Sequence, residues 1–280
     1  MMEKDKNRFH VRTDLALEEH EQFQEDQVEI HGVELHQWEH KKKEIHLSQV
    51  IIKTEEGATA MGKPIGRYLT LEAPKLADKD EDFHREVTEA LANYLLDLLR
   101  LHHVEKGSVL VVGLGNSNAT PDALGPKVME HLQVTRHLYL EYGMDFCEKH
   151  GYPVLSGLTP GVMGKTGMES AEIIKGVVRE TKPEVVIVVD ALATRSAKRL
   201  GITLQLADTG IHPGSGVGNH RNALTKEVLG VPVLAIGVPT VIEFTEPESP
   251  AMYVTPHDID ERIEMLSYTI SEAIHEALFR

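Results

Sequence analysis

Residues 109–127 constrain the fold of this chain most, because they combine a strand, a glycine turn and a helix start in that order. Four β-favouring apolar residues, 109–112, lead into Gly113 and Gly115. A Thr-Pro-Asp turn ending at Asp122 then opens a segment with helical apolar periodicity. In a parallel α/β sheet, ligands and catalytic groups gather outside the carboxyl ends of the strands. Asp122 is therefore well placed for chemistry.

The rest of the chain alternates strand-like and helix-like segments. The expected strands are 109–112, 154–158, 185–189, 202–206 and 231–236, and the expected helices are 81–102, 123–132, 170–181 and 258–278. The run at 185–189 is fully apolar, which is typical of a buried parallel strand. This alternation predicts a single-domain, three-layer α/β sandwich with a mostly parallel central sheet flanked by helices.

The amino-terminal part is less regular. Residues 1–46 are polar and rich in His, Glu and Lys, so we expect a flexible or removable extension. His36 and His40 would share one face of a helix, but a solvated face is the favoured interpretation over a metal site. Two strand-like runs, 46–53 and 68–71, flank several glycines and predict a small β-ribbon ahead of the main sheet.

Composition excludes several classes of protein. The 280 residues are 41% hydrophobic, enough to bury a core, and carry a formal charge of -15, which disfavours nucleic-acid or anionic-membrane partners. The one cysteine, Cys147, cannot form an internal disulfide, so a cytoplasmic location is expected. No apolar run reaches the ~18 residues of a membrane-spanning helix.

Two aspartates stand at corresponding places, Asp122 after one apolar strand and Asp190 at the end of the 185–189 run. If these strands are neighbours, both carboxylates face one crevice and can share a proton. One could then activate water while the other protonates the substrate, as amide hydrolysis requires. The alternative is structural, because an Asp in the first turn of a helix also satisfies free N–H groups.

Other chemistry is less well supported by the motifs. The glycine loop lacks the third glycine of a dinucleotide fingerprint, and no Gly-Lys-Ser/Thr sequence completes a phosphate-binding loop. No serine nucleophile elbow is present. The loop at 210–219 is too glycine-rich to be mere packing, and its His212 is a candidate for hydrogen bonding or metal binding.

Several of these motifs together resemble the germination protease family of spore-forming bacteria. The similarity runs from residues 11–16 to 254–256 and the last helix. The motifs that carry it are VGLGN at 112–116, TPDALGPK at 120–127, PGVMG at 160–164, VDALA at 189–193, GIHPGSGVGN at 210–219 and AIGVPTV at 235–241.

This resemblance implies an atypical aspartic endopeptidase, without a cofactor, that starts the degradation of small acid-soluble spore proteins in the spore core. It also implies a homotetramer made as a zymogen. The two family aspartates correspond to Asp122 and Asp190. Processing is expected at Asp14 and Leu15, which makes residues 1–14 a pro-segment and 15–280 the peptidase domain.

Within that interpretation, Gly113, Gly115 and Asn116 shape the loop that presents Asp122. The fold relatives, hydrogenase-maturation peptidases, hold a metal at similar loops, which keeps His212 as a candidate. A metal-dependent peptidase and a catalytically silent binding protein therefore stay as alternatives. The sequence departs from the longer family members at residues 242–252, where a substantial insertion is missing.

Overall fold

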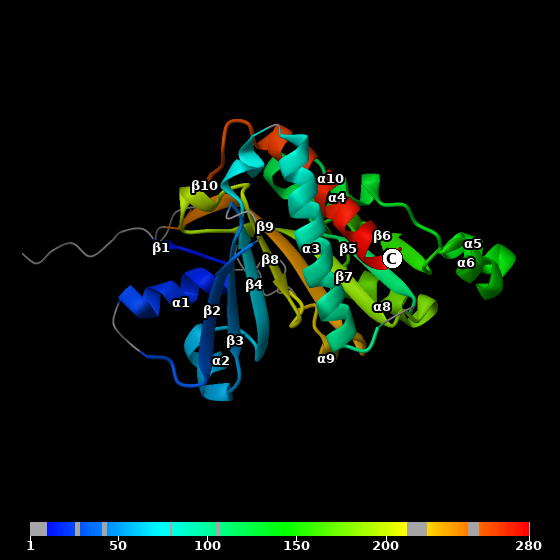
Figure 1. Cartoon of the computed structure of the whole chain (residues 1–280), viewed down its shortest axis with the longest axis horizontal. Helices are drawn as coiled ribbons and strands as arrows, with labels where there is room; N and C mark the ends of the chain where they lie inside the picture. The colour runs from blue at the N-terminus through cyan, green and yellow to red at the C-terminus, as the bar shows by residue number, and fades with distance from the viewer. Residues whose placement is uncertain are drawn as a thin grey trace, which may run out of the picture.

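A computed structural model of the chain describes residues 10–25, 29–40, 44–78, 80–104, 107–211, 223–245 and 252–279. In these residues one large sheet has the strand order β2-β3-β4-β8-β9-β7-β5-β6, with β1 and β10 also paired to β9. Helices cover both faces of the sheet (Figure 1). The predicted three-layer α/β fold is confirmed.

The parallel part of the sheet contains the apolar strands that the sequence singled out. It consists of β5 (Val109–Gly113), β6 (Leu155–Leu158), β7 (Val185–Ala193) and β9 (Val233–Thr245). Strands β5 and β7 are neighbours, so the two strands that carry the aspartates of interest do lie side by side. Residues 185–190 of β7 are buried throughout, as expected of a strand covered on both faces.

The other half of the sheet is antiparallel. It consists of β2 (Val33–Glu39), β3 (His46–Ile52), β4 (Gly66–Glu72) and β8 (Thr203–Ala207). The predicted ribbon corresponds to β3 and β4, which are joined through helix α2 (Glu55–Met61) and continue the main sheet through β8.

The sheet is therefore mixed and less parallel than the sequence predicted. Strand β8 runs antiparallel to β9, whereas β7 runs parallel to it. The link between β7 and β8 holds only the short turn η3 (Ala197–Arg199). A parallel connection would need a crossover of a dozen or more residues, usually through a helix.

One helical layer contains α3 (Glu81–Leu101), α4 (Leu124–His131) and α10 (Ile259–Leu278), which share the largest hydrophobic core. Figure 1 shows α3 crossing the sheet in front of its strands. On the opposite face, α8 (Ser170–Thr181) and α9 (Lys226–Leu229) cover the parallel half. There, α1 (Ala16–Glu25) and α2 cover the antiparallel half.

Shorter elements complete the described chain. They are β1 (His10–Val11), η1 (Pro74–Ala77), η2 (Thr120–Asp122), α5 (Arg136–Tyr142), α6 (Met144–His150), α7 (Met163–Thr166) and β10 (Met252–Val254). Helices α5 and α6 project from the end of the molecule next to β6 (Figure 1). Across the described ranges, no helix has both the length and the apolarity that crossing a bilayer requires.

The expectation of a flexible start is wrong for residues 13–25 and 33–39. Leu15 and Leu17 are completely or almost completely buried, and α1 packs on strands β3 and β4. The polar composition of α1 did not indicate a packed helix. Its charged residues pair with charged residues elsewhere in the fold, and Glu18 is itself buried. His36 lies on strand β2 rather than on a helix.

Candidate active site

A cavity of about 1120 Å³ lies on the sheet face that carries α1 and α2. Strands β7, β8 and β9 contribute its floor, and the α2–β4 turn lies along its wall. Asp122 and Asp190 both line it, together with Asp14 and Gly115. The structure thus brings four of the sequence-predicted site residues to one cavity.

The floor of the cavity contains a row of three residues in register. Asp190 on β7 pairs with Gly237 on β9, and Gly237 pairs with Gln205 on β8. Residues that pair across strands project to the same face of a sheet. A Cβ at position 237 would come within 2.4 Å of the Leu192 side chain, so glycine is needed there. The Leu192 side chain fills the space that a side chain at position 237 would occupy.

Asp190 is a buried carboxylate in an apolar strand, only 6% exposed. The backbone N–H of Ala191 donates to its Oδ1 at 2.9 Å. Burying a carboxylate is costly unless it is hydrogen-bonded. Asp190 therefore places a buried, hydrogen-bonded carboxyl group at the cavity.

Asp122 ends the turn η2, which packs against both β7 and β9. The loop before it folds back tightly, because the Asn116 N–H donates to the Asp122 carbonyl oxygen at 3.0 Å. Gly115 has φ +117°, and a Cβ there would lie 2.0 Å from the same oxygen. The Asn116 side chain accepts from the Asn118 N–H at 3.1 Å. These contacts fix the position from which Asp122 reaches the cavity.

Gly113 has a different task from Gly115. A Cβ at Gly113 would lie 2.2 Å from the carbonyl oxygen of Gly125 in helix α4. The two glycines allow β5 and α4 to approach each other closely, which sets the angle of the intervening loop. Neither Gly113 nor Asn116 lines the cavity, so both act on its shape from outside.

The segment around Asp14 and Leu15 is held inside the fold. The Asp14 N–H donates to the Ala193 carbonyl oxygen at 3.0 Å, and the Ala193 N–H donates to Asp14 Oδ2 at 2.8 Å. Arg12 Nη2 donates to Asp14 Oδ1 at 3.1 Å. Leu15 is completely buried. The expected processing bond therefore lies fixed at the cavity, beside the end of strand β7.

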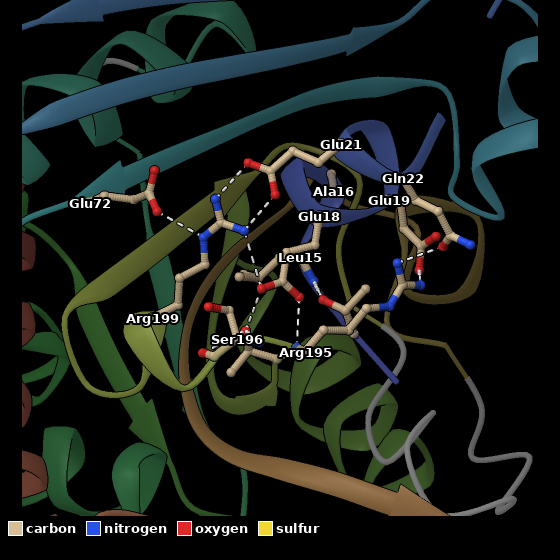
Figure 2. A network of polar contacts seen from close by, with 12 residues as sticks. Leu15, Ala16, Glu18, Glu19, Glu21, Gln22, Glu72, Arg195, Ser196 and Arg199 are labelled. Carbon is tan, nitrogen blue, oxygen red and sulfur yellow. Dashed lines mark hydrogen bonds and ion pairs between the residues drawn. The ribbon is translucent and has the colours of Figure 1, made fainter. Parts of the chain in front are cut away.

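Helix α1 is anchored directly behind this segment (Figure 2). Arg199 donates to Glu72 at 2.7 Å, to both oxygens of Glu21 at 2.7 Å and to Glu18 at 3.2 Å. Arg195 reaches Glu19 at 2.9 Å, and its own N–H donates to Glu18 at 2.8 Å. These contacts hold α1 against the loop that follows β7.

Burial changes the titration of two charged groups at the cavity. It lowers the pKa of the Lys63 ammonium, against the opposing effect of the carboxylates of Asp14 and Glu19. Burial also raises the pKa of Glu243, and nearby Arg12 opposes this shift. Both residues line the cavity.

His212 lies outside the described residues, so its relation to the cavity stays a prediction. Among the residues that the structure does describe, no three His, Cys, Asp or Glu side chains are grouped so as to hold a metal ion.

Sequence reasoning missed Lys63 and Gln205. Gln205 left a detectable signal, since it is a polar residue in the middle of the apolar strand 203–207. Lys63 left none, because it lies between Gly62 and Pro64 in what reads as an ordinary turn. Both were found only from their contacts with Asp14.

Comparison with known proteins points to the germination protease family. The family model described as germination protease matches residues 11–249. The chain is 49% identical to the germination protease of Caldanaerobacter subterraneus subsp. tengcongensis over 233 residues, which are 83% of this chain and 69% of that protein. It is 46% identical to that of Bacillus subtilis over 246 residues, 86% of this chain and 66% of the relative.

The germination protease of Bacillus velezensis is 49% identical over 246 residues, again 86% of this chain and 66% of the relative. The chain thus spans about two thirds of the length of these relatives. A crystal structure of a nickel-iron hydrogenase maturation protease from Thermococcus kodakarensis aligns with a TM-score of 0.37 at 23% identity, over 65% of this chain and 98% of its own.

Proposed function

The chain belongs to the germination protease family, a family of peptidases, and from this premise we propose that it is an endopeptidase that begins the degradation of small acid-soluble spore proteins during germination. One observation supports a mechanism in particular: Asp122 and Asp190 line the same cavity as Asp14, at the expected processing bond. This shared cavity supports the assignment of Asp122 and Asp190 as the groups that cleave the Asp14–Leu15 bond.

In the proposed mechanism, the two carboxylates share one proton. The ionised member takes a proton from water as the water attacks the carbonyl carbon, and the protonated member delivers its proton to the leaving nitrogen. Asp190 lies buried in an apolar strand at the cavity, where its carboxyl group is shielded from bulk water.

We propose further that the chain is made as a zymogen and removes residues 1–14 by cutting between Asp14 and Leu15. The fixed position of this bond at the cavity supports cleavage by the chain's own active site. A homotetrameric assembly in the cytoplasm of the spore core also belongs to this proposal. Sedimentation velocity of the full chain tests the assembly, and a monomer at micromolar concentration would contradict it.

The experiment compares Asp122→Asn and Asp190→Asn with the unchanged chain, incubated at mildly acidic pH and followed by intact mass. We expect loss of the first fourteen residues from the unchanged chain and a rate at least about 100-fold lower in either variant, since positioned acid–base groups contribute about 10²–10⁴-fold. Asp97→Asn, at an exposed carboxylate of α3, is the control and should process normally.

Each outcome decides between the functional alternatives. Normal processing in either active-site variant would overturn the aspartate mechanism. Loss of activity with a chelator, restored by a divalent ion, would instead indicate a metal-dependent peptidase. An unchanged mass of the full chain, together with no cleavage of small acid-soluble spore protein, would indicate a silent binding protein.

A further inference from the structure

Two side chains converge on the carbonyl oxygen of Asp14. Lys63 Nζ donates to it at 3.0 Å, and Gln205 Nε2 donates to it at 3.2 Å. Lys63 follows helix α2, directly after the left-handed Gly62 that ends the helix, and Gln205 lies on strand β8. Donors from two separate elements therefore meet at one backbone oxygen.

The orientation of the Gln205 amide is fixed by a second contact. Its Oε1 accepts from the Ala16 N–H at 2.8 Å. Because only an acceptor can face that N–H, the NH₂ group must face the Asp14 carbonyl oxygen. Gln205 thus spans the Asp14–Leu15 peptide bond and binds the chain on either side of it.

A structural hydrogen bond alone does not explain a lysine at this position. Burying an ammonium group costs free energy, and the lowered pKa of Lys63 reflects that cost. A neutral donor would satisfy a carbonyl oxygen at lower cost. The positive charge becomes advantageous when the oxygen gains negative charge, which occurs when water adds to the carbonyl.

We propose that Lys63 and Gln205 are catalytic residues that stabilise the oxyanion formed at the Asp14 carbonyl oxygen during cleavage of the Asp14–Leu15 bond. This inference rests on the proposed function, because it requires cleavage there. It assigns these two side chains a task separate from that of Asp122 and Asp190, which move protons.

Cleavage of the bond uses one water molecule and the two aspartates. The water oxygen bonds to the Asp14 carbonyl carbon, its proton passes to the ionised aspartate, and the π pair moves onto the carbonyl oxygen facing Lys63 and Gln205. The C–N bond then breaks as the pair returns, and the Leu15 nitrogen takes a proton from the protonated aspartate. The products are the Asp14 carboxyl group and a free Leu15 amine.

The test measures the rate of processing at Asp14–Leu15 by intact mass in Lys63→Met and Gln205→Leu. Removal of one oxyanion donor costs about 10²–10³-fold in rate, and we expect a loss of this size in each variant. Lys53→Met is the matched control, since Lys53 is half exposed, pairs with Glu34 and does not line the cavity. It should process at the unchanged rate.

Thermal unfolding and hydrogen exchange separate catalysis from structure. Lys63→Met removes both the cost of burying a charge and its attraction to the carboxylates of Asp14 and Glu19, so its Tm should stay close to that of the unchanged chain. The Ala16 N–H is bonded to Gln205 and not to Lys63, so it should stay protected in this variant. Slow processing with a retained Tm and a protected Ala16 supports the proposal.

Two results would overturn the proposal. One is processing by Lys63→Met as fast as by Lys53→Met. The other is slow processing accompanied by rapid exchange at Ala16, which would assign Lys63 a merely structural role. If the unchanged chain is not processed at all, the proposed function itself is contradicted. Asp190→Asn and the unchanged chain will then show the same unchanged mass.

Discussion

Gly113 on strand β5 lies close to helix α4, and a Cβ there would come within 2.2 Å of the carbonyl oxygen of Gly125. At the scale of the residue, this contact determines how the loop leaves the strand and therefore where Asp122 stands. Gly237 on the cavity floor is also closely packed, because a side chain there would collide with Leu192. Both positions need glycine for space and not for backbone flexibility.

Gly113→Ala should destabilise the protein by about 1–3 kcal/mol, because the added methyl group must displace backbone atoms. Chemical denaturation measures the free energy of unfolding. Gly176→Ala in helix α8 is the matched control, since nothing lies within 4 Å of its Cβ position. Alanine should stabilise that helix by about 0.5–1 kcal/mol. Equal effects of the two substitutions would contradict the packing argument.

Glu243 offers a pH-dependent prediction at the same scale. It is buried, its Oε1 has no hydrogen-bond partner among the described residues, and burial raises its pKa. A carboxyl group with a raised folded-state pKa destabilises the fold at neutral pH, and this penalty disappears as pH falls below its unfolded-state pKa of about 4.3.

Glu243→Gln should therefore raise Tm at pH 7, and the difference from the unchanged chain should shrink toward pH 4. Melting curves across this pH range provide the measurement. A difference that is constant with pH would show that the ionisation of Glu243 is not responsible.

Among the elements, helix α1 is joined to the rest of the fold by ion pairs to Arg195 and Arg199. Arg199 joins Glu18 and Glu21 of this helix to Glu72 of strand β4 (Figure 2). Burial alone would lower the pKa of Arg199, but its hydrogen bonds to Glu21 and Glu72 raise it overall. The guanidinium therefore stays charged, and it compensates the buried carboxylate of Glu18.

Arg199→Ala should destabilise the fold by about 3–5 kcal/mol, because it leaves a buried carboxylate without its main countercharge. Limited proteolysis should then cut within α1, residues 16–25, which packs on strands β3 and β4 in the unchanged chain. Arg179→Ala, on the exposed face of α8, is the control and should change the free energy of unfolding by less than about 0.5 kcal/mol. If α1 resists proteolysis in Arg199→Ala, the apolar contacts of α1 are sufficient to hold it on the sheet.

In the whole molecule, one hydrophobic core extends across the sheet from β3 to β6 and includes α10. The only tryptophan, Trp38, lies on β2 at the edge of this sheet and donates to the Tyr94 hydroxyl of α3 at 3.2 Å. Its fluorescence therefore reports on the antiparallel half.

Ile270→Ala, in the completely buried face of α10, should lower stability by about 2–5 kcal/mol. If the two halves unfold as one unit, Trp38 fluorescence and far-ultraviolet circular dichroism should shift together to lower denaturant concentration. Separate transitions for the two signals would instead show that the antiparallel half unfolds independently.

The parallel strands, the long helices and the family were predictable from the sequence alone. The periods of apolar residues predicted the parallel strands and the long helices, because strand and helix periodicity are local properties. The order of the motifs and the residues within them indicated the germination protease family. Asp122 and Asp190 were singled out because catalytic groups gather at the carboxyl ends of parallel strands. Those two residues line one cavity because β5 and β7 are neighbours.

The surroundings of Asp14 depend on contacts between segments that are distant in the sequence. Its contact with Lys63 joins residues 49 positions apart, and its contact with Gln205 joins residues 191 positions apart. The mixed sheet and the docked α1 likewise depend on pairings between distant segments. No local pattern records such contacts, because their free energy arises only when the completed sheet brings the segments together.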